Sequence, residues 1–136
     1  MQTLITVLSV AILLLFVGMW GTWKIYKARL RSPYRSATKG DSPVQLLLFT
    51  RPYCAICKLK QLPIVTQLKT ELGDAVCVKE IDPTFQPEFA EQYGIMNVPS
   101  SFIFDGHGHL QVANYGFVNA KKLRRQLRQA ITRRVG

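Results

Sequence analysis

The feature that most constrains the fold of this chain is the pair Cys54 and Cys57, which directly follows an apolar segment. Residues 46–49 read Leu-Leu-Leu-Phe, as in a strand that is covered on both faces. The two cysteines stand at the expected start of a helix, with two residues between them. The helix dipole and the free N–H groups of a first turn stabilise a thiolate, which is the reactive form of cysteine. The spacing therefore predicts a site that makes and breaks a disulfide.

The N-terminal segment is apolar enough to enter a membrane. Residues 1–23 contain no charged side chain, and Trp20, Trp23 and Tyr26 mark its end, as in an aromatic belt at a membrane interface. A cleaved signal peptide is the alternative, but such peptides begin with basic residues and end in a small-residue cleavage site. This segment has no basic residue at its start, and its possible cleavage site is a poor one. We therefore expect residues 1–23 to form a retained transmembrane anchor.

Positive charge predicts how that helix is oriented. A run of bases follows it, and no acid precedes Asp41. The positive-inside rule then places the N-terminus outside and the following domain in the cytoplasm. The opposite orientation, with the domain on the extracytoplasmic side, stays open because a tethered domain can face either way. We therefore expect a single-pass membrane protein whose domain is cytoplasmic.

The formal net charge of +10 is concentrated at the two ends of the chain. Residues 1–40 and 119–136 carry most of the bases, whereas residues 41–118 contain more acids than bases. Anionic lipid headgroups attract such basic segments. Nucleic acid is the rival partner, but no stacking aromatic residues accompany the basic C-terminal segment. The charge pattern therefore favours a membrane surface and no nucleic acid.

The remainder of the chain divides into a linker and a domain of alternating strands and helices. Residues 24–43 are predicted to be a basic juxtamembrane linker, because Ser, Pro and Gly interrupt any helical pattern there. From residue 44 onward, apolar periodicities typical of strands and helices follow one another. The predicted strands are residues 44–50, 75–81, 101–104 and 110–115, and the predicted helices are residues 54–72, 87–93 and 120–134.

Single residues are expected to bend, end or cap these helices. Pro63 should kink the first helix, Gly73 should end it, and Asn119 should cap the last. The last helix carries an apolar stripe that should dock on a sheet. The expected apolar stripe of the first helix consists of Leu59, Leu62, Val65, Leu68 and Leu72.

The order of these elements restricts the topology. A strand, a helix and a second strand require a parallel pair, and the last two strands form an antiparallel hairpin around residues 105–108. Helices can cover both faces of the resulting four-stranded mixed sheet. The expected structure is an α/β domain of residues 44–136.

Several segments of this domain resemble one known family. The segment from Phe49 to Lys58 is similar to the active site of thioredoxins, with a hydrophobic strand, an aromatic residue before the first cysteine and a basic residue after the second. Residues 81–82 resemble the end of the following strand, and residues 93–100 resemble the loop that carries the family's cis-proline. The similarity covers about residues 44–132. It implies a thioredoxin-like fold, here preceded by a transmembrane helix.

The resemblance also implies roles for individual residues. Cys54 would be the exposed nucleophile, and Cys57, which is less exposed, would resolve the mixed disulfide. Pro99 would follow a cis peptide bond and face the cysteine pair. Tyr53 and the backbone of Val98 would contact an extended segment of the substrate. No metal is implied at this site.

The sequence also departs from the family pattern. Thioredoxins bury an aspartate in the strand before the cysteines and pair it with a lysine in the next strand. In this chain Leu48 stands at the position of the aspartate, and Val78 stands at the position of the lysine. Lys79 is one residue away and is expected on the other face of the sheet. The family's helix proline is expected near Leu62 but is found at Pro63. Proton transfer from Cys57 is therefore expected to be slower or to use water.

Other readings of the cysteines and histidines can be weighed on the sequence. The cysteine pair could form a structural disulfide or half of a zinc site, but zinc needs four ligands and only Cys77, His107 and His109 remain. We therefore favour a redox pair. Cys77 is expected to be a small buried residue, with a third redox thiol or a lipidation site as alternatives. The two histidines are expected to be solvated turn residues.

The sequence thus predicts a membrane-anchored thiol–disulfide oxidoreductase that reduces or exchanges protein disulfides. Its only redox group would be the Cys54–Cys57 pair, with no separate cofactor. Its expected partners are a disulfide-containing protein and an electron-donor protein or small thiol, because no nucleotide or flavin motif is present. A cytoplasmic domain favours reduction, and an extracytoplasmic one would favour oxidation or isomerisation. The alternative function is a non-catalytic binding or assembly module, which the missing aspartate and lysine favour.

Overall fold

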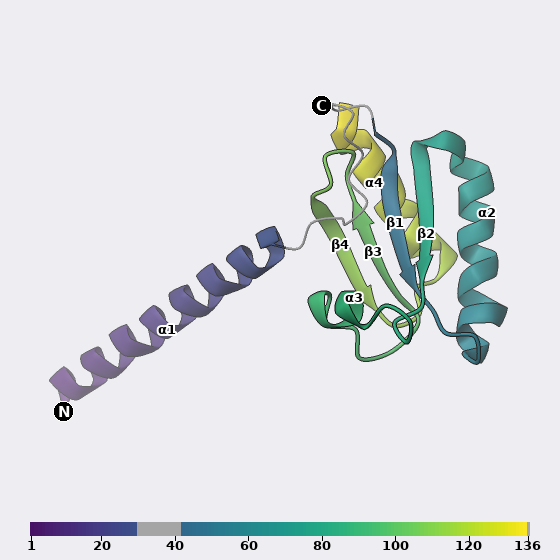
Figure 1. Cartoon of the computed structure of the whole chain (residues 1–136). Helices are drawn as coiled ribbons and strands as arrows, with labels where there is room; N and C mark the ends of the chain where they lie inside the picture. Colours follow the sequence, from purple (N-terminus) through teal and green to yellow (C-terminus); the bar gives the residue numbers. More distant parts are fainter. Residues whose placement is uncertain (30–41, 136) are drawn as a thin grey trace. The chain divides into compact units, whose positions relative to one another are not determined.

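The computed structural model describes residues 1–29 and 42–135, and the chain divides into two compact units, Met1–Leu30 and Arg31–Gly136. The first unit is one long helix, α1 (Gln2–Arg29) (Figure 1). Within it, Gln2–Ile25 has 24 residues and a mean hydropathy of 2.4, with none of its apolar stretch buried in the protein. At 1.5 Å per residue this 24-residue segment is about 36 Å long, against about 30 Å for a hydrocarbon core. It is thus long and apolar enough to cross a membrane, a property that a signal sequence shares.

Helix α1 continues through residues 24–29, the first part of the predicted linker. The linker residues 30–41 lie outside the described part of the chain. The division into an anchor, a linker and a domain therefore stays a prediction.

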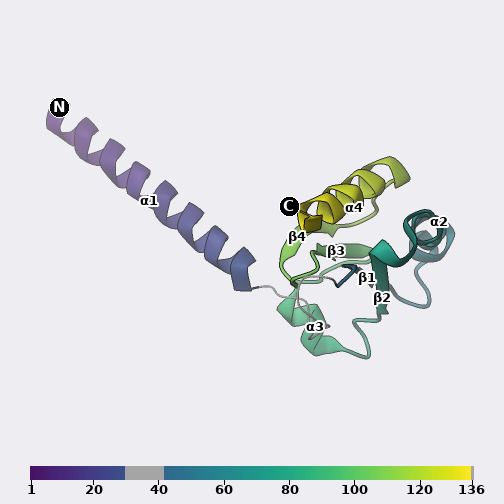
Figure 2. The ribbon, with the colours of Figure 1, turned by 90° about the horizontal axis from the view of Figure 1, so that it is seen from above.

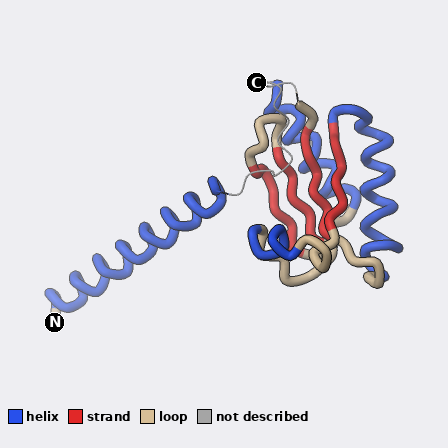
Figure 3. The backbone as a smooth tube through the Cα atoms, viewed as in Figure 1, coloured by secondary structure: helices blue, strands red, loops and turns tan. Residues whose placement is uncertain are grey.

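The second unit contains the predicted strands and helices in the predicted order (Figure 3). Their bounds differ from the predicted ones by only one or two residues at most ends. A π-helical turn (Cys57–Gln61) and a 3₁₀ turn (Gly73–Ala75) flank the first helix of this unit. The regular elements are β1 (Val44–Phe49), α2 (Leu62–Leu72), β2 (Val76–Ile81), α3 (Pro87–Gln92), β3 (Ser100–Phe104), β4 (Leu110–Tyr115) and α4 (Ala120–Val135).

The sheet has four strands in the order β2-β1-β3-β4. Strand β1 is parallel to β2 and antiparallel to β3, and β4 is antiparallel to β3. Helices α2 and α4 cover one face of the sheet and α3 lies on the other (Figure 2). The domain therefore has a thioredoxin-like α/β fold, as predicted.

The two faces of β1 supply the two halves of the core. Leu46 and Leu48 are buried in an aliphatic cluster with side chains of α2 and α4. Phe49 points to the other face, where its ring centroid lies 5.8 Å from that of Tyr93, which follows α3. Because all six residues of β1 are buried, both faces of this strand are covered. The continuous apolar run before the cysteines is explained by this position.

The last helix docks on the sheet as predicted. Leu123, Leu127 and Ala130 are buried in the aliphatic cluster, and Ile131 packs against it. The Asn119 side chain accepts a hydrogen bond from the Lys122 N–H at 2.9 Å, so it caps the helix.

Candidate active site

Cys54 lies where the chain passes from β1 into a helix. Its N–H donates to the Arg51 carbonyl at 3.1 Å, which closes a turn after the strand. Its own carbonyl accepts from the Lys58 N–H at 3.1 Å, so Cys54 stands at the N-terminal end of the helix. Cys54 and Cys57 form a disulfide, with their Cα atoms 5.2 Å apart. Cys54 is partly exposed, whereas Cys57 is fully buried.

The first turn of the helix supplies a donor to the outer sulfur. The Cys57 N–H lies 3.2 Å from the Cys54 Sγ atom. When the disulfide is reduced, this donor and the helix dipole favour a thiolate on Cys54. A stabilised, partly exposed sulfur next to a buried one is the arrangement that thiol–disulfide exchange requires.

The loop before β3 faces this sulfur. The Val98–Pro99 peptide bond is cis, as the family resemblance implied. The Val98 carbonyl oxygen lies 4.0 Å from the Cys54 Sγ atom, and Pro99 is buried. The Pro99 carbonyl accepts from the Gly116 N–H at 2.9 Å, which ties the loop to the end of β4. Within the described residues the Val98 N–H has no partner, so it is available to an extended peptide.

A groove of about 410 Å³ adjoins Cys54. Its walls come from the turn before the cysteine, from the loop after β2 and from the loop before β3. Two of its lining side chains are large, apolar and exposed, with Tyr53 100% and Phe85 79% accessible. Exposed apolar groups of this size mark a binding surface. The groove is lined by Arg51, Pro52, Tyr53, Cys54, Asp82, Thr84, Phe85 and Val98.

Sequence reasoning identified Tyr53, which lines this groove, but missed Phe85. A signal was present, because Phe85 is a large apolar residue between Thr84 and Gln86, in a loop and outside any periodic pattern. Such residues are rarely exposed without a function when they cluster beside a reactive group.

None of the described residues near the buried end of the cysteine pair is a buried carboxylate. Leu48 is fully buried in the aliphatic cluster, Val78 packs against that cluster, and Lys79 is exposed. These positions agree with the departures expected from the sequence. Among the described residues, Asp105 is the one buried carboxylate, and it follows β3 at the opposite end of the sheet. The described part of the core therefore offers Cys57 no acidic proton acceptor.

Gln61 is a buried polar residue that sequence reasoning also missed. It is only 1% exposed, although it lies between Lys60 and Leu62 in a segment expected to present leucines to the core. The prediction that Leu59 belongs to the buried apolar stripe of the helix is wrong, since its side chain is 76% exposed. The buried face of the helix runs instead through Cys57, Gln61, Val65 and Leu68.

A π-helical turn explains this change of face. The Leu62 N–H donates to the Cys57 carbonyl, five residues back, rather than four. In a regular α-helix, a residue eight positions before Val65 lies about 80° away from it around the axis. The wider turn rotates Cys57 back towards the buried face. Compared with the family pattern, this chain has one extra residue between Cys57 and its helix proline, Pro63. The π-helical turn accommodates that residue, and it is the irregularity that the helix shows next to Pro63.

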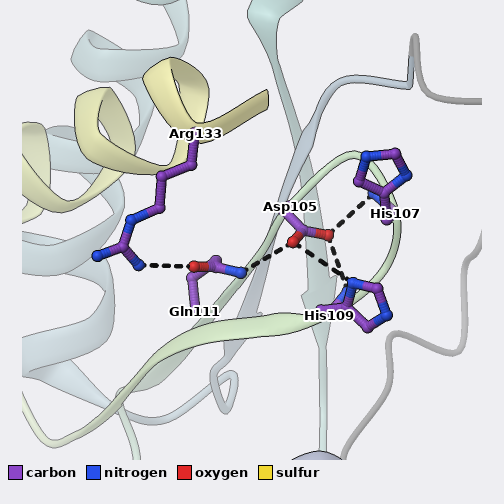
Figure 4. A network of polar contacts seen from close by, with 5 residues as sticks. All are labelled: Asp105, His107, His109, Gln111 and Arg133. Atoms are coloured by element: carbon purple, nitrogen blue, oxygen red, sulfur yellow. Dashed lines mark hydrogen bonds and ion pairs between the residues drawn. The ribbon is translucent and has the colours of Figure 1, made fainter. Parts of the chain in front are cut away.

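The remaining cysteine and the histidines lie away from this site. Cys77 is free and partly exposed, rather than buried as expected, because β2 is an edge strand. His107 and His109 are exposed, as predicted, and their N–H groups both donate to one oxygen of Asp105 at 2.9 Å (Figure 4). The Gln111 amide donates to the other Asp105 oxygen at 2.8 Å. The Asp105 carboxylate therefore organises the β3–β4 hairpin.

Comparison with known proteins agrees with this architecture. The Thioredoxin family model matches residues 28–130 of the chain. The thioredoxin of Alicyclobacillus acidocaldarius subsp. acidocaldarius is 30% identical over 73 residues, which cover 54% of this chain and 68% of the relative. The thioredoxin of Bacillus subtilis (strain 168) is 31% identical over 74 residues, covering 54% and 69%. The chain thus spans about two thirds of the length of these relatives.

A solved structure shows the same fold at low sequence similarity. Thioredoxin-2, described as a component of malaria parasite protein secretion machinery, superposes with a TM-score of 0.59 at 16% identity. The match covers 64% of this chain and 82% of that chain. At this level of identity the likeness concerns the fold alone.

Proposed function

This chain belongs to the thioredoxin family and is a thiol–disulfide oxidoreductase, and from that premise we propose that it acts at a membrane on the disulfides of protein substrates. The observation that carries the proposal is the position of Cys54. Cys54 is partly exposed at a helix N-terminus, and its sulfur accepts a hydrogen bond from the Cys57 N–H at 3.2 Å. The same residue lines an apolar groove.

The proposed reduction proceeds in two exchanges. The Cys54 thiolate attacks one sulfur of the substrate disulfide, whose S–S bond breaks, and the other substrate sulfur leaves as a thiolate that takes a proton. Cys57 then loses its proton and attacks the Cys54 sulfur, which releases the second substrate thiol. Two electrons pass to the substrate, and the enzyme is left with the Cys54–Cys57 disulfide. An electron-donor protein or a small thiol reduces that disulfide again.

The groove residues are proposed to hold the substrate. Tyr53 and Phe85 offer apolar contacts in the groove beside the reactive sulfur. The unpaired Val98 N–H can bond to the backbone of an extended segment next to the substrate cysteine. An extended segment of a protein substrate is therefore the proposed occupant of this surface.

Helix α1 is proposed to be the membrane anchor. Its 24-residue apolar segment carries no charge before Lys24, and bases follow. The positive-inside rule then puts the redox domain in the cytoplasm, where the dithiol form is favoured and reduction is the expected direction.

The activity is tested by insulin reduction with the purified full-length chain and a chemical thiol as electron source. We expect turnover in the wild-type protein and none in the Cys54→Ser variant, with Cys77→Ser as the control that retains activity. The same assay distinguishes the alternative function, because the wild-type protein itself would be inactive if it were only a binding or assembly module. The loss of the buried aspartate at Leu48 is the observation that favours this alternative.

Orientation is tested with a membrane-impermeant thiol reagent in a Cys77→Ser background. Labelling of Cys54 only after cell lysis is expected for a cytoplasmic domain. Labelling in intact cells would reverse the orientation and point to oxidation or isomerisation outside the membrane.

A further inference from the structure

The last helix, α4, has two faces of different chemistry. Its apolar face is occupied, because Leu123, Leu127 and Ala130 are buried against the sheet. Among the side chains of α4 that the structure describes, those on the opposite, exposed face include no apolar residue and no acid. The residues exposed there are Lys121, Lys122, Arg125, Arg128, Gln129, Thr132 and Arg133.

Only part of this positive charge is neutralised within the protein. Glu71 of α2 forms ion pairs with Arg124 at 2.9 Å and with Arg128 at 2.8 Å. Among the described residues, Lys121, Lys122 and Arg125 have no ion-pair partner. These unpaired cations lie side by side on the helix, because positions three and four apart share a face.

The shape of the surface argues against a small ligand. The cationic side chains enclose a shallow groove of about 580 Å³, all of it lined by one helix. Glu71 holds Arg124 and Arg128, and Arg133 donates to Gln111 at 2.8 Å, but each of the lining cations is at least partly exposed, so none of them is a buried donor. A surface of this kind suits a repeating array of negative charges better than one bound anion.

We propose that this face of α4, defined by Lys121, Lys122, Arg125, Arg128 and Arg133, docks on the anionic headgroups of a lipid bilayer. Two observations favour a membrane over nucleic acid. The same chain carries an apolar helix that is long enough to span a bilayer. The face also lacks aromatic side chains on which bases could stack. This inference rests on the proposed membrane attachment and adds to it a second, lipid-selective contact of the redox domain.

The contact can be measured on the full-length chain in lipid nanodiscs. Gln129 lies exposed among the cations, so a fluorophore on Gln129→Cys reports on their surroundings. Labelling the oxidised protein in a Cys77→Ser background leaves the Cys54–Cys57 disulfide intact. We expect acrylamide to quench this fluorophore at least about twofold less in discs with about 30% phosphatidylglycerol than in phosphatidylcholine discs. High salt should remove the difference, because it screens the attraction.

Two charge-reversal variants show which cations matter. Lys121→Glu with Arg125→Glu should abolish the lipid-dependent protection. Lys58→Glu with Lys60→Glu changes the net charge equally on another exposed surface and should retain it. Equal quenching in both discs, or equal protection in the Lys121→Glu/Arg125→Glu variant, would overturn the proposal.

Other outcomes identify which claim has failed. Protection by a single-stranded oligonucleotide but not by phosphatidylglycerol would assign the face to nucleic acid and overturn the proposal. A chain that does not stay with phosphatidylcholine discs would overturn the membrane anchor itself. Insulin reduction by the Lys121→Glu/Arg125→Glu variant in detergent should equal that of the wild type, so the redox function is judged independently.

Discussion

The side chain of Gln61 binds the backbone of Val118 through both of its polar atoms. Its Oε1 atom accepts from the Val118 N–H at 2.9 Å, and its Nε2 atom donates to the Val118 carbonyl at 3.3 Å. Both residues are buried. The contact joins the π-helical turn after the cysteines to the segment between β4 and α4, although the two lie far apart in the sequence.

Replacing Gln61 should therefore cost stability. The Gln61→Ala substitution leaves the buried N–H and carbonyl of Val118 unpaired, and an unpaired buried polar group costs about 1–3 kcal/mol. We expect the free energy of unfolding to fall by about that amount in urea titrations of the oxidised chain. Gln67→Ala is the matched control, because Gln67 is exposed on the same helix and should change stability little. Equal losses in the two variants would mean that the contact with Val118 contributes nothing.

The exposed side chains around the groove should determine how well substrates bind. Tyr53→Ala and Phe85→Ala remove apolar surface that a substrate would cover, so we expect KM for insulin to rise about threefold to tenfold with kcat little changed. Leu59→Ala is the control, since Leu59 is equally apolar and 76% exposed but does not line the groove. Unchanged KM values in both groove variants would place substrate binding elsewhere.

The two cysteines should behave differently when one is removed. Cys57→Ser keeps the exposed nucleophile but cannot complete the second exchange, so a mixed disulfide between Cys54 and the substrate should accumulate. In a Cys77→Ser background, Cys54→Ser should form none, because the one remaining cysteine, Cys57, is fully buried. Non-reducing electrophoresis followed by mass spectrometry of the captured peptide measures both. Trapping through Cys54→Ser instead would reverse the assigned roles.

Much of the fold was predictable because its signals are local. The continuous apolar run of β1 follows from its burial on both faces, and Gly73 and Gly94 end their helices with positive φ angles of 56° and 63°. The cysteine pair and the loop with Pro99 were also predictable, since each is a short segment whose residues resemble those of one family.

What the sequence did not predict depends on contacts between distant segments. Periodicity assumes a regular α-helix, so the π-helical turn before Leu62 displaced the predicted face and exposed Leu59. The burial of Gln61 depends on a partner 57 residues away. The groove beside Cys54 likewise needs Phe85 from another loop, which only the folded chain brings there.

Stability at acidic pH should depend on Glu71. Two hydrogen bonds from the Arg124 side chain, at 3.1 and 2.9 Å, hold the pKa of this carboxyl below its ordinary value of 4.5, and Arg128 adds to the effect. The folded protein therefore binds this proton less readily than the unfolded chain. The stabilisation is fully present above the ordinary pKa and is lost as the pH falls through the lower pKa of the folded state. Glu71→Gln should thus be less stable than the wild type at neutral pH, and the difference should shrink at low pH.

Thermal unfolding of both proteins between neutral pH and pH of about 3 measures this convergence. Glu91→Gln is the control, because it removes an exposed carboxylate that has no ion-pair partner among the described residues. The convergence should also weaken in high salt, since Glu71 is 31% exposed and its ion pairs are partly screened by solvent. A wild-type advantage that stayed constant down to the lowest pH would show that the carboxylate charge is not the source of the stabilisation. In that case hydrogen bonds that the uncharged Glu71 carboxyl still accepts from Arg124 and Arg128, and that the glutamine amide reproduces less well, would have to account for it.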